Sequence, residues 1–538
     1  MKRRLSTLGL GVLMLGSICA AHADNEISET GHQVKHVLLI SVDGMHALDL
    51  SNYVAAHPGS TLAALSQHGM TYTNNATTTP SDSFPGLTSL LTGGSPVTAG
   101  FWYDDTYNRA LSPPRLTDGL GNPGGVCPGK VGTNVAWDEA IDIDLTRLDA
   151  GGGINAKFLV RDPQNGCQTV MPHQYLRVNT IFEVVKAHGG TTAWTDKHPS
   201  YEWTNGPSGN GVDDFYGPEI NSIPVPLPQF ANCATVPFVD ATPDDGWTNS
   251  FADIRCYDLL HVQAVINQID GFNHDRSRHA AVPTVFGTNF QAVSVGEKLA
   301  VDPVTGDKGG YADVSGTPNA GLAGELDFVD QSLGTIVNEL KAQRLYDSTL
   351  IIISAKHGQS PIDGSKRQAI GGGQPAATIG SAEAFDISDD GSLIWLTSPS
   401  LASSVVAQLS LPANQQALGI QEIIAGAALR NKFDDPRLDP RTPDIVLKVN
   451  TGVIFTGGTK LSEHGGFNED DMHTALLVSL PNLEPATIAA ATTNQQVAPT
   501  IIKALGWDPQ ELQAVRKEQI HVLPFLFSGE AATGPTGF

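Results

Sequence analysis

The chain has 538 residues, a formal net charge of −24 and only 16% charged residues. This balance argues against a nucleic-acid-binding protein, because such proteins carry clustered Lys and Arg that neutralise phosphates. The length allows two or three domains, but α/β chains often run long as one domain with insertions. The chain is long enough to bury a large core.

The N-terminus has the pattern of a secretory signal peptide. A basic start at Lys2–Arg4 precedes an apolar run from Leu8 to Ile18 and an A-x-A site at Ala21–Ala23. The apolar run is too short to span a bilayer, and no second one follows it. We therefore predict a signal peptide over residues 1–23, no membrane anchor, and a periplasmic or secreted protein.

The predicted elements alternate along the chain between short apolar strands and helices. This pattern is typical of an α/β fold with a mainly parallel central sheet flanked by helices. The predicted strands are Val37–Val42, Thr191–Trp194, Thr284–Asn289, Thr349–Ser354, Asp444–Val449 and Thr474–Ser479. The predicted helices are Thr61–Gln67, Thr180–Ala187, Tyr257–Ile269, Leu322–Leu340 and Val497–Leu505.

Long stretches rich in Gly, Pro, Asn and Asp lie between these elements, near residues 111–178 and 200–256. Because they carry aromatic residues and cysteines, we predict ordered insertions in a single domain of residues 24–538. Loops of this length in a compact domain usually serve binding or form lids. Their aromatic residues either line a leaving-group pocket or form a core within the loops; examples are Trp102, Tyr103, Trp203 and Phe215.

Four cysteines follow the predicted signal peptide: Cys127, Cys167, Cys233 and Cys256. An even set in an oxidising compartment indicates disulfides. Three pairings are possible, and proximity in the sequence favours the first with the second and the third with the fourth. A four-cysteine zinc site is the alternative, but the chain has no C-x-x-C pair.

Polar residues follow two of the buried strands. The segment "HVLLISVDGMH" ends its apolar run at Asp43-Gly44, and "STLIIISAKHGQS" ends its run at Lys356-His357-Gly358. Open α/β folds bind their ligands at the carboxyl ends of strands, where a lone carboxylate is commonly a metal ligand. A turn-forming Asp-Gly is the alternative for the first segment.

A serine opens the predicted helix after the first strand. Ser83-Phe84-Pro85-Gly86 leads into the apolar run Leu87–Leu91. Ser83 is either an N-cap, whose hydroxyl satisfies a free backbone N–H, or a group placed where a helix N-terminus binds phosphate or sulfate. The sequence around it does not decide between the two.

Taken together, these segments and "SEHGGFNEDDMHTALLVSLP" resemble the type I phosphodiesterase/nucleotide pyrophosphatase branch of the alkaline phosphatase superfamily. The resemblance implies an alkaline-phosphatase-like fold and hydrolysis of small phosphate esters or diesters. It implies Ser83 as a metal-activated nucleophile, and Asp43, Ser83, His357 and His464 as ligands of a divalent metal such as zinc.

The chain departs from the family pattern at two places. Lys356 stands where the family's D-H-G turn has its Asp, and an ammonium group has donors only. The family's D-x-x-x-H motif is missing from the window after Thr284–Asn289, which contains no His. Asp270 and His274 have that spacing, but they precede the strand and we interpret them as loop residues.

The remaining ligands predict one metal ion rather than two, because a zinc ion takes about four ligands. Lys356 then has three interpretations. It acts in catalysis as a point charge beside Ser83, it marks a fold retained for binding without catalysis, or it is a surface lysine. A sulfatase-like hydrolase is a further alternative, disfavoured because no C/S-x-P-x-R segment follows the nucleophile.

Overall fold

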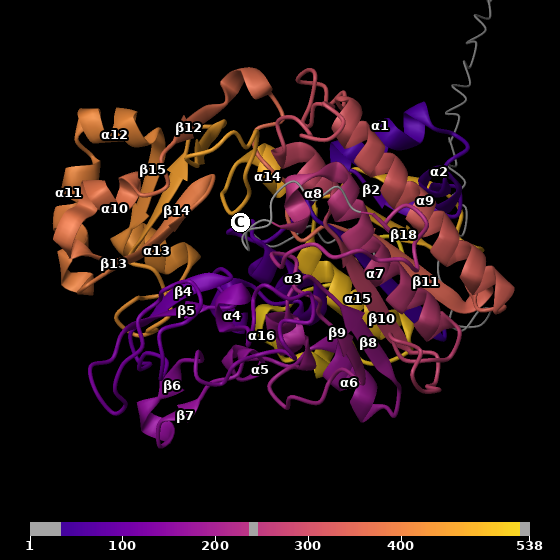
Figure 1. Cartoon of the computed structure of the whole chain (residues 1–538), viewed down its shortest axis with the longest axis horizontal. Coiled ribbons are helices and arrows are strands. Elements are labelled where there is room, and N and C mark those ends of the chain that lie inside the picture. The colour runs from indigo at the N-terminus through magenta and orange to yellow at the C-terminus, as the bar shows by residue number, and fades with distance from the viewer. Residues whose placement is uncertain (1–33, 236–245, 528–538) are drawn as a thin grey trace, which may run out of the picture.

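The computed structural model describes residues 34–235 and 246–527 (Figure 1). Its largest element is an eight-stranded sheet in which β1 pairs in parallel with β10 on one side and β11 on the other. Only β18 runs against the other strands of this sheet, so the predicted mainly parallel sheet is confirmed. In spatial order the strands are β19 (Ala486–Ile488), β2 (Gly69–Tyr72), β18 (Leu476–Ser479), β11 (Thr349–Ser354), β1 (His36–Val42), β10 (Val285–Phe290), β8 (Thr192–Thr195) and β9 (Asp214–Tyr216).

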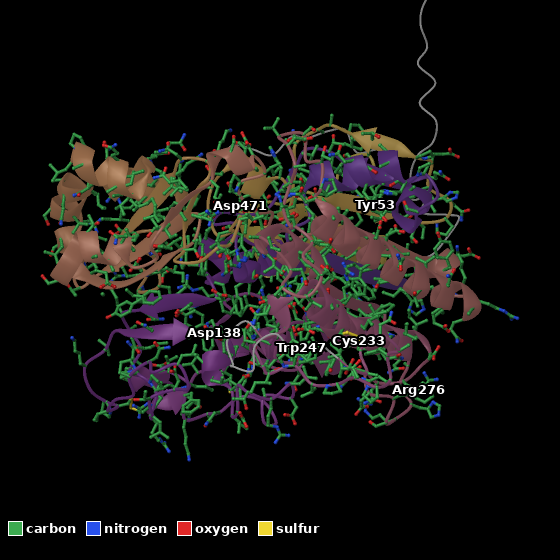
Figure 2. All side chains as sticks on the ribbon, turned by 45° about the horizontal axis from the view of Figure 1, so that its top comes forward. Tyr53, Asp138, Cys233, Trp247, Arg276 and Asp471 are labelled. Atoms are coloured by element: carbon green, nitrogen blue, oxygen red, sulfur yellow. A yellow bond between two sulfur atoms is a disulfide. The ribbon has the colours of Figure 1, made fainter. Side chains whose placement is uncertain are left out.

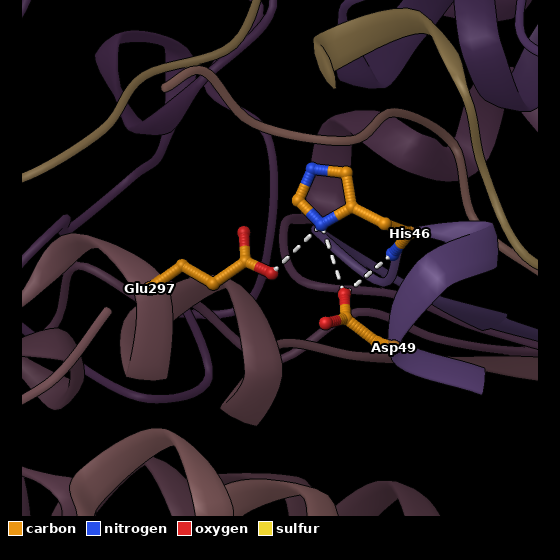
Figure 3. Close-up of side chains that lie close together, drawn as sticks. All are labelled: His46, Asp49 and Glu297. Carbon is orange, nitrogen blue, oxygen red and sulfur yellow. Dashed lines mark hydrogen bonds and ion pairs between the residues drawn. The ribbon is translucent and has the colours of Figure 1, made fainter. Parts of the chain in front are cut away.

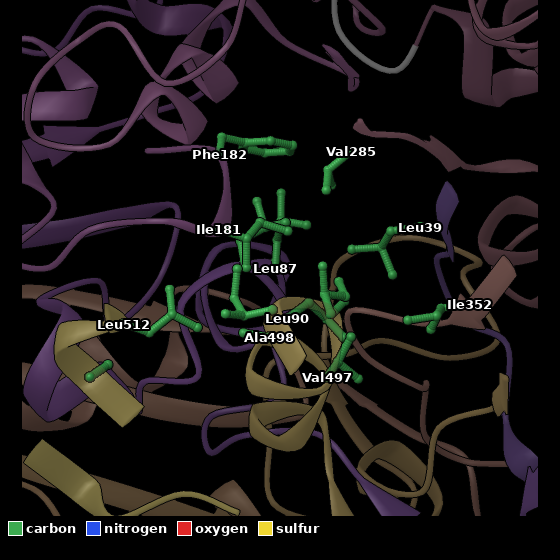
Figure 4. Packing of buried hydrophobic residues seen from close by; sticks show 14 of the residues in the cluster. Leu39, Leu87, Leu90, Ile181, Phe182, Val285, Ile352, Val497, Ala498 and Leu512 are labelled. Carbon is green, nitrogen blue, oxygen red and sulfur yellow. The ribbon is translucent and has the colours of Figure 1, made fainter. Parts of the chain in front are cut away.

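Helices cover both faces of this sheet, which is why its central strands read as continuous apolar runs. Leu39 and Ile352 pack on one face against three helices (Figure 4), and Leu38 and Ile40 pack on the other against five. The first set is α3 (Ser83–Thr92), α6 (Ile181–Ala187) and α15 (Val497–Ala504). The second set is α1 (Ala47–Ala56), α2 (Thr61–Ser66), α7 (Phe251–Ile269), α8 (Ala292–Lys298) and α9 (Ala320–Ala342).

A second sheet of four antiparallel strands lies beside the first and has its own apolar core (Figure 1, orange). The predicted strand Asp444–Val449 is present but belongs here, as β16. In order the strands are β13 (Glu383–Ser388), β14 (Gly391–Leu396), β16 (Ile445–Val449) and β15 (Ile420–Ala425). The accompanying helices are α10 (Gln374–Ile379), α11 (Ala402–Leu409), α12 (Pro412–Leu418) and α13 (Gly426–Lys432).

Most predicted elements differ from the observed ones by one or two residues, and Thr349–Ser354 agrees at both ends. The largest shift is in α7, which begins at Phe251 rather than Tyr257, because the Ser250 hydroxyl caps it by accepting from the backbone N–H of Asp253 at 3.1 Å. Further short elements are β3 (Asn75–Ala76), β4 (Asp105–Asn108), β5 (Thr133–Ala136), β6 (Arg161–Asp162), β7 (Gln168–Thr169), β12 (Gln368–Ile370), β17 (Val453–Phe455), β20 (Thr492–Thr493), α4 (Pro96–Ala99), α5 (Pro172–Tyr175), α14 (Glu469–Met472) and α16 (Gln513–Glu518).

Two disulfides close the long insertions, Cys127–Cys167 and Cys233–Cys256. They confirm the pairing that sequence proximity favoured and exclude the four-cysteine zinc site. The second bond ties a loop to α7 and packs in one apolar cluster with Trp247 (Figure 2). Among residues 34–235 and 246–527, no helix has the length and apolarity to cross a membrane.

Three of the four aromatic residues singled out in the insertions form cores. Trp102 and Tyr103 pack with strands of the second sheet, and Trp203 packs against Phe84 and Phe101 beside α3. All three side chains are buried, while Phe215 is partly buried against the same core as Trp203. These contacts favour the interpretation that the aromatic residues form a core rather than line a leaving-group pocket.

Replacing Cys233 and Cys256 together with Ala should lower the free energy of unfolding by about 3 kcal/mol, because the bond constrains a loop of the unfolded chain. The two cysteines lie 23 residues apart in the sequence. Guanidinium unfolding followed by tryptophan fluorescence measures the change. A loss below about 1 kcal/mol would contradict a stabilising role for this bond.

Candidate active site

Four neighbouring parallel strands bring their polar residues to one edge of the central sheet. Asp43 follows β1, Lys356 and His357 follow β11, and the pair Asp196-Lys197 follows β8. The carboxyl ends of parallel strands meet at the same edge, where such sheets bind their ligands. β10 adds two amides there, from Asn289 within the strand and Gln291 after it.

Ser83 is the first residue of α3 and is completely buried. The N-cap interpretation of Ser83 is wrong, because Asp82 takes that place and its Oδ2 accepts from the backbone N–H of Phe84 at 3.0 Å. Gly86 brings this helix against the turn after β11: a Cβ added to it would lie 2.0 Å from the carbonyl oxygen of Lys356. The helix and the Lys-His-Gly turn are therefore in direct backbone contact.

The Ser83 hydroxyl lies between a base and a cation. Its Oγ is 3.3 Å from His357 Nε2 and accepts from Lys197 Nζ at 3.0 Å. His357 Nδ1 is 2.8 Å from the carbonyl oxygen of Gly358. Because a carbonyl only accepts, Nδ1 carries the hydrogen and Nε2 presents its lone pair toward Ser83. Burial lowers the pKa of His357, and the nearby Asp43 carboxylate opposes this shift.

Donors surround the buried carboxylate of Asp43. The amide of Asn289 donates to Oδ1 at 2.7 Å, and the amide of Gln291 donates to Oδ2 at 2.6 Å. The ammonium groups of Lys356 and Lys197 each lie 3.8 Å from Oδ2. Burial alone would raise the pKa of this carboxyl, but the cations around it, Lys356 first, hold the pKa well below its ordinary value. Asp43 is therefore ionised.

Lys356 is completely buried, so its interpretation as a surface lysine is wrong. Its Nζ donates to Asp196 Oδ1 at 2.7 Å and lies 4.3 Å from the centre of the Tyr201 ring. With Asp43 on its other side, the ammonium group bridges two carboxylates and contacts an aromatic face. These contacts explain how a lysine can end a buried strand.

His464 adjoins the site through His357, since the two rings stack with their centres 3.7 Å apart. Its Nδ1 faces Asp82 Oδ1 at 3.7 Å, and neither atom has a hydrogen-bond partner. Burial, followed by His357, lowers the pKa of His464 well below its ordinary value. The structure thus brings all the predicted site residues into one cluster around Ser83.

Asp270 and His274, the pair with the spacing of the family's missing motif, do not reach this cluster. Asp270 accepts from Arg276 at 2.7 Å, and His274 Nδ1 lies 2.7 Å from Asp214 Oδ1 at the start of β9. These contacts are consistent with the interpretation of both as loop residues.

Sequence reasoning missed the residues that follow β8. Lys197 contacts the nucleophile candidate, and Asp196 is the counter-ion of Lys356. The run Asp196-Lys197-His198 could have indicated them, because it follows the predicted strand Thr191–Trp194 after one residue. Charged side chains at that position lie at the same edge of the sheet as Asp43.

Two groups of described residues could hold a metal ion, and neither contains the predicted ligands. The first is His46, Asp49 and Glu297 (Figure 3). His46 Nδ1 lies 2.9 Å from Asp49 and 3.3 Å from Glu297, and its Nε2 lies 2.9 Å from the carbonyl of Gln359. Burial opposes protonation of His46, but the two carboxylates raise its pKa well above its ordinary value. This group is therefore an ion-pair cluster with its own cation.

The second group is Glu139, His198 and Glu219, of which His198 directly follows Lys197 in the chain. Around Asp43 itself, the site does not fit the family's metal pair. Among the four predicted ligands, Asp43 is the one carboxylate, and both of its oxygens already accept from amides. The positive charge that metals would supply comes instead from Lys356 and Lys197.

Replacing Lys356 with Met should lower the free energy of unfolding by about 3–5 kcal/mol, because buried Asp196 loses its ammonium partner and Asp43 loses one of the two ammonium groups near it. Adding Asp196→Asn to Lys356→Met should recover part of this loss, since the amide needs no cation. Urea unfolding of the two single variants and the double variant measures the coupling. Additive effects would show that the two side chains do not interact.

A sequence model of the family "Type I phosphodiesterase / nucleotide pyrophosphatase" matches residues 37–156 and 305–473, which is more than half of the chain. No curated protein matches significantly.

Among solved structures, an inactive variant of murine ectonucleotide pyrophosphatase/phosphodiesterase 5 in complex with AMP is 13% identical, with a TM-score of 0.52, over 88% of this chain and 95% of that one. The alkaline phosphatase PafA is also 13% identical, with a TM-score of 0.57, over 88% of this chain and 96% of that one. The alkaline-phosphatase-like fold is thereby confirmed. The chain belongs to the type I phosphodiesterase/nucleotide pyrophosphatase family, a family of phosphoester hydrolases.

Proposed function

We propose that the protein is an exported hydrolase of small phosphate esters or diesters, with Ser83 as its nucleophile. One observation carries the proposal: the Ser83 hydroxyl lies 3.3 Å from an imidazole nitrogen with a free lone pair and 3.0 Å from an ammonium group. A nucleophile needs a base to take its proton and a positive field for the charge that develops. Ser83 has both within contact distance.

His357 is the proposed base. As Ser83 Oγ bonds to phosphorus and the ester P–O bond breaks, the Oγ proton passes to His357 Nε2 and then to the leaving oxygen. Asp43 Oδ2, 3.6 Å from Nε2, stabilises the imidazolium that forms between these steps. Water then attacks the phospho-serine, with His357 taking a proton from the water and returning one to Ser83.

Lys197 is the proposed phosphate-binding cation. Its side chain is about nine-tenths buried, and it reaches Ser83 from the end of β8. The N-terminus of α3 adds the positive end of a helix dipole at the same point. Together they would bind the non-bridging oxygens of the substrate and stabilise the negative charge of the transition state.

Lys356 is proposed as a positioning residue rather than a group that contacts substrate. Its ammonium group is bonded to Asp196 and lies 3.8 Å from Asp43, beneath the ring of Tyr201. It keeps Asp43 ionised in a buried site, and Asp43 in turn serves His357. The predicted effect of Lys356 on catalysis would then act through Asp43.

The single zinc ion predicted at Asp43, Ser83, His357 and His464 is not used in this mechanism. The ammonium groups of Lys197 and Lys356 each lie 3.8 Å from the Asp43 carboxylate that would bind the ion. A metal cation on that carboxylate would be repelled by both ammonium groups in a buried site. These charges support catalysis by this chain's own side chains. Metal analysis of wild type and Asp43→Asn tests the alternative. If wild type holds one ion more than Asp43→Asn, the predicted zinc binds at Asp43.

Export and substrate class rest on separate observations. The two disulfides support an oxidising compartment, while the predicted signal peptide of residues 1–23 lies outside the described residues. The murine neighbour bound to AMP supports a small phosphoester, including a nucleotide, as substrate. This last step is an analogy between folds.

Ser83→Ala should lower kcat/KM on a chromogenic phosphate ester by at least about 10³-fold, because it removes the nucleophile. Lys197→Ala should lower it by about 10²–10³-fold through loss of charge stabilisation. Lys341→Ala, on an exposed position of α9, is the matched control and should change nothing. Phosphomonoester, phosphodiester and sulfate ester substrates are tested in parallel.

Wild-type protein inactive on all three esters would favour the non-catalytic binding protein. Activity confined to the sulfate ester would favour the sulfatase-like alternative. Ser83→Ala at the wild-type rate would show that another group attacks phosphorus.

The acid limb of the pH profile should report His357. Only neutral His357 accepts a proton, so kcat/KM should fall as the pH drops through its pKa. Burial lowers that pKa, so the midpoint should lie below the ordinary value of 6.5. Rates measured between pH 4 and 8 provide the profile, and His357→Gln should lose both the rate and this limb. A midpoint above 6.5 would argue against His357 as the base.

A further inference from the structure

The second group of candidate metal ligands has no part in the proposed chemistry. Glu139 begins the short helix Glu139–Ile141, His198 precedes the short helix Pro199–Asn205, and Glu219 lies in the loop after β9. These residues come from separate segments of the chain. Glu139 belongs to the first long insertion and Glu219 to the second.

The three side chains converge inside the protein. Their potential ligand atoms all lie within 4.8 Å of one another, and each side chain is at least nine-tenths buried. His198 Nδ1 is 2.8 Å from Glu219 Oε2. Asn221 donates its side-chain amide to Glu139 at 2.7 Å and its backbone N–H to Glu219 at 2.9 Å. These bonds hold the two glutamates in place.

A fourth carboxylate, Asp142, points to a missing ligand. It is 2% exposed, and neither of its oxygens has a hydrogen-bond partner. Its carboxyl group is in contact with that of Glu219. Two buried carboxyl groups in contact require a proton or a cation between them.

The charged groups that face His198 are mostly acidic, and its Nδ1 already lies against Glu219. Further acids, Asp104 and Asp196, also face His198, and the cation that faces it, Lys197, is engaged by Ser83 and Asp43. The carboxyl groups of this cluster therefore still require a proton or a cation.

We propose that Glu139, Asp142, His198 and Glu219 bind one divalent transition-metal ion of the zinc class. Ca²⁺ and Mg²⁺ prefer sites made of oxygen alone, whereas imidazole together with carboxylates suits zinc. Glu139, His198 and Glu219 converge, and Asp142, which lies against Glu219, would supply the fourth ligand that a structural zinc site needs. The ion joins both insertions and fixes His198, the residue next to Lys197. The assignment does not rest on the proposed hydrolase activity.

The test uses the full-length protein, stripped with a chelator, loaded with Zn²⁺ and dialysed. We expect one tightly held equivalent of zinc by elemental analysis and a Tm several degrees above that of the stripped protein. Asp142→Asn and the more exposed Glu139→Gln should each weaken zinc binding about 10–100-fold and remove the Tm shift. Asp149→Asn, at an exposed position of the same insertion, is the control and should bind like wild type.

Asp43→Asn separates this site from the active site, because it should keep the zinc. Loss of the ion in Asp43→Asn, with retention in both cluster variants, would overturn the assignment. So would wild-type protein that retains no zinc, or a Tm that rises with Ca²⁺ and not with Zn²⁺. The wild-type titration does not depend on any variant folding.

Discussion

The buried negative charge of Asp43 is the constraint on which the site depends. An ionised carboxylate without access to water must be paired, and an unpaired one costs several kcal/mol. Here two amides bond to its oxygens and two ammonium groups stand 3.8 Å away. Lys356, itself buried, then needs Asp196 as its counter-ion. The charges near Ser83 thus form a connected set, and changing one member shifts the others.

Backbone packing gives this set its geometry. The parallel strands β1, β8, β10 and β11 deliver the charged groups at one edge, and α3 delivers Ser83 from above the turn after β11. Gly86 allows that helix to touch the backbone of Lys356, which a side chain there would prevent. The close contact between Ser83 and His357 therefore follows from helix-to-turn packing, not from a flexible loop.

The sequence was most informative where a polar residue directly follows a buried strand or opens a helix. That pattern found Asp43, Ser83, Lys356 and His357. It missed Lys197, which the family motif does not mark, although Lys197 follows a buried strand as well. The second sheet was missed because β16 is as buried as a central strand and periodicity cannot assign a strand to a sheet. β13, at the edge of the same sheet, is only half-buried throughout.

The distribution of paired and unpaired charges separates the two clusters physically. Near Ser83, Asp43 and Asp196 are both paired with donors, whereas Oδ1 of Asp82, which faces His464, has no hydrogen-bond partner. In the insertions, both oxygens of Asp142, beside Glu219, also lack a partner. The carboxylates of Asp43 and Asp196 are therefore balanced by lysines, while the pair Asp142 and Glu219 still needs a proton or a cation. Lys197 and His198, adjacent in sequence, join these two clusters.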